Sequence, residues 1–180
     1  MDYQILRSRR KTLAIEITPR GAVLVRAPLR LSKRDIQRFV DSRQSWIETH
    51  LAQIPKAEPL SKEEHQALIR TAKKVIPPKA AFFADKLGVT FGRISIRSQH
   101  TRWGSCSAVG NLNFNCLLML CPDEVQDFVV VHELCHRKEM NHSPRFWAEV
   151  ESVLPGYRIQ RQWLKENGAA LMARLPDVQK

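Results

Sequence analysis

The sequence predicts an α+β fold, in which an N-terminal β-hairpin region with helices precedes a short antiparallel sheet packed on an HExxH helix. Three observations predict this arrangement. Apolar and polar residues alternate over the first thirty positions, and apolar residues then recur at helical spacing from 36 to 51. Further along, the HExxH motif HELCH occupies 132–136, directly behind the apolar run FVVV at 128–131, which indicates a central, buried helix.

The first fifty residues predict strands followed by one helix. The strand pattern is carried by Ile5, Leu13, Ile15, Ile17, Val23 and Val25. The segment TPRG at 18–21 is typical of a turn between two of these strands. Ser32 with Asp35 is typical of a helix start. The helix that follows places apolar residues on one face and basic residues, among them Arg34, Arg38 and Arg43, on the other.

The next segment predicts a helix with an interruption. Ser61 and Glu64 have the spacing of a capping box, which opens a helix that runs to about Val75. Two prolines at 77–78 are expected to interrupt it, because proline lacks the backbone donor of a helix interior. The helix is then expected to resume until Gly88 ends it.

Two strands and another helix are predicted after Gly88. Strands are expected around 94–97 and 112–117, joined by a loop. The segment CPDE at 121–124 is typical of a helix start, with proline at the first position and acids in the first turn. This helix is expected to continue to about Met140 and to carry the HExxH motif.

The HExxH motif places metal-binding side chains on one helix face. His132 and His136 are one turn apart, with Cβ atoms about 5–6 Å apart, so both imidazoles can bind one zinc ion. Glu133 is rotated by about 100° from His132 and is free to activate a water at the ion's open position. Chance would produce the motif only about 0.01 times in a chain of this composition. The motif therefore favours a catalytic zinc site.

His142 is the candidate for the third zinc ligand. On one continuous helix its spacing from His136 would point it away from the ion, so we expect the helix to end between them. Asn141 is the expected stop, because asparagine tolerates the left-handed backbone of a helix end. The SP pair at 143–144 then supplies an N-cap and a first-turn proline for another helix. The prediction is one Zn²⁺ per chain, with Glu133 as general base.

Charge and cysteine usage restrict the partners and the location. Residues 1–100 contain 20 Lys and Arg against 9 Asp and Glu, whereas residues 101–180 contain 9 of each. This asymmetry indicates an anionic partner such as nucleic acid, a nucleotide or an acidic protein, or else a basic face that serves solubility alone. The four cysteines form no CxxC pair, no secretory signal is evident and no apolar run nears the roughly 18 residues of a membrane span. We therefore expect a cytoplasmic protein that does not cross a membrane.

Four segments together resemble the YgjP-like metallopeptidases, a zincin-like family near the SprT and WLM-type proteins. They are RWGSCS at 102–107, N-x-N-x-N at 111–115, HELCH at 132–136 and NHSPRFW at 141–147. The N-terminal pattern VRAP…FV…WI also fits, so the resemblance covers most of the chain. It implies a zincin-like core, zinc on His132, His136 and His142, and Glu133 as general base. We expect residues 1–58 to form a basic β-hairpin region with a helix and residues 59–180 to form the metallohydrolase core, as two parts or as one compact unit.

Related zinc enzymes suggest one alternative for the third ligand. The histidine spacing equals that of metzincins, but Glu139 stands where those proteins require glycine, and no methionine turn is evident. A gluzincin arrangement would instead use Glu149 or Glu151 as the third ligand. Either acid could more simply be solvated or lie behind the ligands.

Three further residues are candidates for contact with the substrate. Zincins commonly bind an extended peptide along an edge strand, which 94–97 or 112–115 could supply. Gly104 would then permit close approach of a substrate backbone, and Arg102 could meet an anionic group or stabilise an oxyanion. Tyr157 is a candidate hydrogen-bond donor to the transition state. Surface or core positions are the simpler interpretation of Arg102 and Tyr157.

Three functions are consistent with the sequence. The first is a zinc metallopeptidase that hydrolyses an extended peptide or unfolded protein. The second is a metal-dependent phosphohydrolase acting on a nucleotide or nucleic acid, although such sites usually recruit several carboxylates. The third is a nucleic-acid-associated, SprT-like protease in which the basic face binds nucleic acid.

Overall fold

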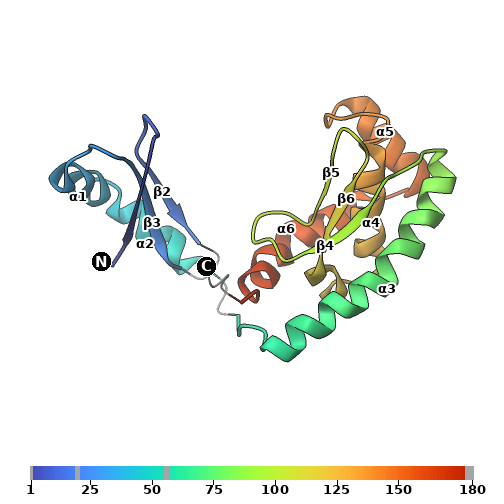
Figure 1. Cartoon of the computed structure of the whole chain (residues 1–180), viewed down its shortest axis with the longest axis horizontal. Coiled ribbons are helices and arrows are strands. Elements are labelled where there is room, and N and C mark those ends of the chain that lie inside the picture. Colours follow the sequence, from blue (N-terminus) through green and yellow to red (C-terminus); the bar gives the residue numbers. More distant parts are fainter. Residues whose placement is uncertain (1, 19–20, 55–56, 177–180) are drawn as a thin grey trace. The chain divides into compact units, whose positions relative to one another are not determined.

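The computed structural model describes residues 2–18, 21–54 and 57–176. The chain divides into two compact units, Met1–Ala57 and Glu58–Lys180, which are described separately (Figure 1). The elements combine helices with two small sheets, so the predicted α+β class is confirmed. Among the described residues, no helix has both the length and the hydrophobicity that crossing a bilayer requires.

The first unit contains a three-stranded sheet. Strands β1 (Gln4–Ser8), β2 (Ala14–Ile17) and β3 (Val23–Pro28) lie in the order β1-β3-β2. The predicted hairpin is formed by β2 and β3, which pair antiparallel, whereas β1 pairs parallel to β3. Pro19 and Arg20 of the predicted turn lie outside the described residues. Beside them Gly21 has a φ of 84° and donates from its N–H to the Thr18 carbonyl at 2.9 Å, which explains the glycine.

Two helices cover this sheet where one was predicted. Helix α1 (Lys33–Asp41) begins at Ser32, whose side chain accepts from the Asp35 N–H as expected. It ends at Ser42, and α2 (Gln44–Ala52) begins two residues later. The helical spacing of apolar residues continues from α1 into α2, because the apolar side chains of both helices pack in the same core as β3. The side chains that pack together in this core are Val23, Val25, Ala27, Ile36, Val40 and Ile47.

The second unit opens with the long helix α3 (Lys62–Leu87), shown in green in Figure 1. The predicted capping box at its start and the left-handed Gly88 at its end are both present. The predicted interruption is wrong, because the helix continues through Pro77 and Pro78. Its buried face, including Ala72, Ile76 and Ala80, is continuous across the prolines, so core packing offsets the two lost backbone donors.

The second sheet is mixed, whereas the sequence predicted an antiparallel one. Strands β4 (Ile94–Arg97), β5 (Gly104–Cys106) and β6 (Leu112–Asn115) lie in the order β4-β6-β5. Strand β5 lies in the predicted loop and is too short to show an alternating pattern. It turns back antiparallel along one edge of β6, and β4 pairs parallel along the other edge.

The N-x-N-x-N segment holds these strands and their loops together. Asn111 accepts from the Arg93 N–H, and Asn113 donates to the Ser105 hydroxyl, so each amide links β6 to a neighbouring segment. The buried Asn115 side chain donates to the carbonyls of Gln99 and Arg102 and accepts from the Leu117 N–H. This last bond ends β6 at Asn115 and begins the 3₁₀ helix η1 (Cys116–Leu120), where the strand was predicted to continue to Leu117.

Three helices complete the second unit: α4 (Asp123–Cys135), α5 (Pro144–Val153) and α6 (Arg158–Ala173). Helix α4 packs on α3, α6, α5 and β5, and most of its residues are buried. The predicted start is confirmed to within one residue, since Pro122 is the N-cap. The HExxH motif therefore stands at the C-terminal end of a helix enclosed by the core.

The amide of Asn115 gives a test of this loop architecture. In Asn115→Asp, an oxygen replaces the nitrogen that faces two carbonyls, so we expect a loss of about 3 kcal/mol in unfolding free energy at pH 7. Asn113→Asp is the matched control. Its carboxylate would accept from Ser105 and Arg97, so we expect a change within about 0.5 kcal/mol. Urea denaturation measures both, and equal losses would contradict this account.

Candidate metal centre

The C-terminal end of α4 places the two histidines of the motif. His132 lies in the last turn and His136 is the C-cap, so the helix stops at Cys135 and not near Met140 as predicted. The predicted left-handed stop at Asn141 is also wrong, because no described residue other than glycine has a positive φ. The chain leaves the helix where the Arg137 side chain donates to the Thr90 and Ala108 carbonyls, which ties this end to the sheet loops.

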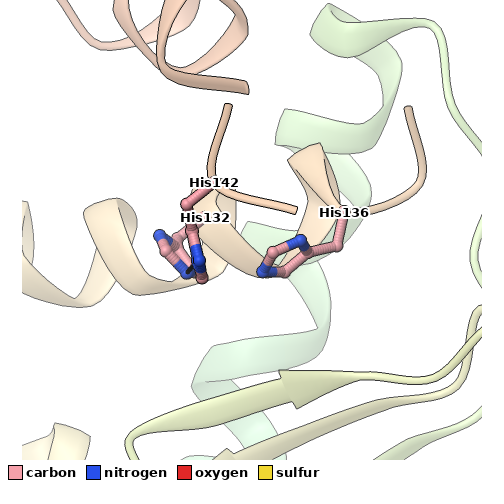
Figure 2. A group of neighbouring side chains, drawn as sticks. All are labelled: His132, His136 and His142. Carbon is pink, nitrogen blue, oxygen red and sulfur yellow. Dashed lines mark hydrogen bonds between the residues drawn. The ribbon is translucent and has the colours of Figure 1, made fainter. Parts of the chain in front are cut away.

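His142 reaches the other two histidines from the segment before α5. Helix α5 starts as predicted, with Ser143 accepting from the Phe146 N–H and Pro144 in the first position. Figure 2 shows the three imidazoles gathered at the end of α4. Their centroids are 5.1 Å apart for His132 and His136, 4.8 Å for His132 and His142, and 4.9 Å for His136 and His142. One nitrogen from each ring lies within 4.8 Å of the others, a spacing that could hold one metal ion.

The hydrogen bonds of the three rings fit a cation between them. His136 Nδ1 is 3.0 Å from the Glu139 carbonyl, so Nδ1 carries the proton and Nε2 keeps its lone pair. The Nε2 atoms of His132 and His142 face each other at 2.9 Å. His132 Nδ1 is buried and has no partner among the described residues, so the protein supplies little else to satisfy this ring. A metal ion would take the place of the hydrogen between these two nitrogens and accept a lone pair from each.

Phe146 is an element of this site that the sequence analysis did not identify. Its buried ring lies 4.9, 4.7 and 4.8 Å, centroid to centroid, from His132, His136 and His142. One aromatic ring therefore supports all three imidazoles. The sequence contained one signal for this role. Phe146 lies in the first turn of α5, just after the Ser143 N-cap, and a side chain in this position points back towards His142.

Burial disfavours the charged forms of His132 and His142. It lowers the pKa of His132 to about 3, with smaller contributions from His136, His142 and Arg161. It also lowers the pKa of His142, again assisted by His136 and Arg161. Arg161 is held close because its guanidinium lies 4.5 Å from the centre of the Trp147 ring, which itself packs beside His142. Neutral imidazoles have the lone pairs that metal binding requires.

Glu133 is enclosed beside the histidines and beneath β5. Its side chain is only 5% exposed, and burial raises the pKa of its carboxyl group to about 8, with the charge of Arg102 acting in the opposite direction. A Cβ atom at Gly104 would lie 2.5 Å from Glu133 Oε1 and 2.6 Å from its Cγ. Gly104 therefore makes room for Glu133, a contact that the sequence did not indicate.

Strand β5 is the edge of the sheet that contacts α4, and β6 is central and cannot serve as an edge. The Trp103 carbonyl accepts from the Asn115 N–H, and Ser107 donates to Asn111. In an antiparallel pair this alternation turns the backbone groups of Gly104 and Cys106 away from β6. Two outward-facing peptide units thus lie beside Glu133.

The remaining candidates are distributed around the centre. Arg102 is exposed, two residues before β5 begins. Tyr157 is buried, with its ring 5.1 Å from that of Trp147 and 6.0 Å from that of Phe128, so it forms part of the aromatic wall behind His142. The two acids of the gluzincin alternative are engaged elsewhere, because Glu149 pairs with Lys138 and Glu151 with Arg158.

Comparisons with known proteins give a family match. The family model described as "YgjP-like, metallopeptidase domain" matches residues 11–68 and 57–167. The crystal structure of the metallopeptidase zymogen of Pyrococcus abyssi abylysin is 23% identical, with 51% of this chain and 94% of that chain covered and a TM-score of 0.47. The crystal structure of the metallopeptidase zymogen of Methanocaldococcus jannaschii jannalysin is 20% identical, with 52% of this chain and 94% of that chain covered and a TM-score of 0.44. No curated protein matches.

The contact between Gly104 and Glu133 can be measured with a double-mutant cycle. Gly104→Ala should cost about 1–3 kcal/mol of stability, because the new methyl group overlaps the Glu133 side chain. In a Glu133→Ala background, which removes the overlapping atoms, the same substitution should cost less than half as much. An equal loss of stability in both backgrounds would show that Gly104 is needed for a reason other than its contact with Glu133.

The pH dependence of stability tests the burial of Glu133. The metal-free folded protein keeps a proton on Glu133 up to about pH 8, whereas the unfolded chain releases it near 4.5. The unfolding free energy should therefore fall as pH rises from 4.5 to 8, by at most about 1.4 kcal/mol per pH unit. Glu133→Gln should lack this component. Denaturation of both proteins in chelator at pH 5 and pH 8 measures it, and a constant difference between them would contradict the expectation.

Proposed function

Because this chain belongs to the YgjP-like metallopeptidase family, we propose that it is a zinc-dependent peptidase whose ion is held by His132, His136 and His142. The observation that carries the proposal is the convergence of three imidazoles beside one enclosed carboxyl group, that of Glu133. Three imidazoles suit zinc, and three protein ligands leave the fourth position that catalytic zinc sites keep open.

The zinc ion would supply Lewis acidity, which polarises the scissile carbonyl and lowers the pKa of a water at the open position. The protein's part is to hold the ligands ready. Phe146 supports the three rings, and the Glu139 carbonyl fixes the His136 tautomer with Nε2 unprotonated. Little reorganisation of these side chains is then needed when the ion binds.

Glu133 is the proposed general base. Its carboxylate would take a proton from the attacking water and later donate it to the leaving amine nitrogen, so the same oxygen serves both steps. Burial supports this role by raising the carboxyl pKa of the metal-free protein to about 8, near enough to neutrality for the group both to accept and to release a proton. Gly104 keeps that carboxylate against β5, close to where a paired substrate would run.

The outward-facing edge of β5 is the proposed substrate contact. An extended peptide could pair with the backbone groups of Gly104 and Cys106 and so bring its scissile bond beside Glu133. Arg102, exposed just before this strand, would meet an anionic group of that peptide. Tyr157 is better suited to supporting Trp147 than to donating to a transition state, since its ring is buried in a stack.

The other two functions have less support. A phosphohydrolase site would need further carboxylates, and the metal-ligating cluster found among the described residues contains three histidines and no acid. A nucleic-acid partner rests only on the charge of residues 1–100 and on no described contact. We therefore propose a peptide or unfolded protein as the substrate.

Metal content and hydrolysis, measured on one preparation, test the proposal. The wild-type protein should contain about one zinc per chain and cleave an unfolded, fluorescently labelled protein. Glu133→Gln should keep the zinc and lose at least 10³-fold in kcat/KM, because Glu133 is not a ligand. Glu149→Gln is the matched control, with the same chemical change on α5, and it should retain both zinc and activity.

The possible outcomes separate the functions. Loss of zinc in Glu149→Gln would favour the gluzincin arrangement. If the wild type hydrolyses a nucleoside triphosphate and not the protein, and Glu133→Gln abolishes this, the site is a phosphohydrolase. A wild-type protein that binds no zinc would refute the proposal.

A further inference from the structure

A groove lies along β4, the sheet edge opposite β5. It has a volume of about 450 Å³ and is lined by Lys73 and Pro77 of α3 and by residues 93–97. Strand β6 separates β4 from β5, so the two edges are about 10 Å apart at a strand spacing of about 4.8 Å. The groove is therefore distinct from the metal centre.

The backbone of β4 presents unpaired groups to this groove. The Leu112 N–H donates to the Arg93 carbonyl, and Ile94 is paired in register with Leu112. In a parallel ladder this pattern directs Arg93 and Ser95 towards β6 and turns the N–H and C=O groups of Ile94 and Ile96 outwards. Within the described part of the chain these outward groups have no hydrogen-bond partner. They form a short template for another strand.

The side chains around the groove are basic. Ile94 and Ile96 pack into the core, so Arg93, Ser95 and Arg97 project from the other face of the sheet. Lys73 adds a third cation from α3. No acidic residue lines the groove, and none of these cations forms an ion pair with a residue that the structure describes. The α3 side and the β4 side of the groove therefore both favour an anionic occupant.

We propose that the free edge of β4 binds an extended acidic segment of a protein chain, which adds to the sheet as a fourth strand. About five residues would span 93–97, with alternate side chains facing Arg93 and Arg97. We assign this acidic segment to the protein substrate, and in this respect the inference rests on the proposed function. Strand β4 would hold one part of the substrate, while β5 pairs with the part that contains the scissile bond.

A polypeptide suits this groove better than a nucleic acid does. Its alternating donors and acceptors match the outward groups of Ile94 and Ile96, which a phosphate backbone cannot do. Proteins that bind single-stranded nucleic acid stack bases on aromatic side chains, and no aromatic residue lines the groove.

Fluorescence anisotropy with a labelled peptide tests the proposal. The probe is Gly-Glu-Val-Glu-Val-Glu-Gly, and the protein is the full chain carrying Glu133→Gln, so that cleavage cannot interfere. Adding Lys73→Glu, or Arg93→Glu with Arg97→Glu, should weaken binding at least tenfold. Lys74→Glu is the matched control, since this neighbouring exposed lysine does not line the groove, and it should change binding less than twofold. Thermal melting confirms that each variant is folded.

A second probe separates strand pairing from ionic attraction. N-methylation of both valines removes two backbone donors and keeps every charge, so it should also weaken binding at least tenfold. Equal binding of the methylated peptide, an equal loss in Lys74→Glu, or no binding at all would overturn the proposal. Tighter, Lys73-dependent binding of a single-stranded oligonucleotide would assign the groove to nucleic acid instead.

The assignment to substrate has its own readout. Adding the acidic segment to a cleavable substrate should lower KM in the wild type and leave it unchanged in Lys73→Glu, with kcat unaffected. A KM that does not respond would overturn the substrate assignment.

The anisotropy measurement is repeated with metal-free protein. Peptide binding without proteolysis would then refute only the proposed function, and proteolysis without peptide binding would refute only this inference.

Discussion

The enclosure of α4 is the constraint on which the rest of the second unit depends. The helix is covered by α3, α5, α6 and β5, yet its last turns carry two imidazoles and a carboxyl group. Polar groups in such a place need partners. The surrounding elements accommodate them: the segment before α5 brings His142, α5 brings Phe146, and β5 brings a glycine that leaves room for Glu133. The site is thus formed by the elements that bury the helix.

Local signals were sufficient for much of this architecture. The capping residues Ser32, Ser61 and Ser143 were identified correctly because a cap depends on residues within one turn. The i,i+4 spacing of His132 and His136 was sufficient to predict that these two rings lie together, because such a pair requires only a helix, and their role as zinc ligands stays a prediction. The family was also identified correctly from its motifs. The roles of Arg102, Gly104, Tyr157 and Glu133 in catalysis stay predictions.

The errors share one physical origin, which is tertiary packing. Pro77 and Pro78 do not break α3, because the buried face of that helix continues on both sides of them. Strand β5 has only three residues and exists because β6 pairs with it. The end of α4 is fixed where Arg137 reaches the carbonyls of distant loops, and not by the left-handed tendency of asparagine. None of these contacts is encoded in neighbouring residues.

The place of Phe146 beneath the imidazoles has a consequence for metal choice. Its centroid lies 4.7–4.9 Å from the centroids of all three imidazoles, so van der Waals contact with this one ring limits how far the imidazoles can shift together. An aromatic ring is incompressible and carries no charge that could adapt to a different ion. Discrimination among cations of similar radius would then come from their intrinsic affinity for imidazole and from their abundance in the cell, because the scaffold itself presents the same aperture to each.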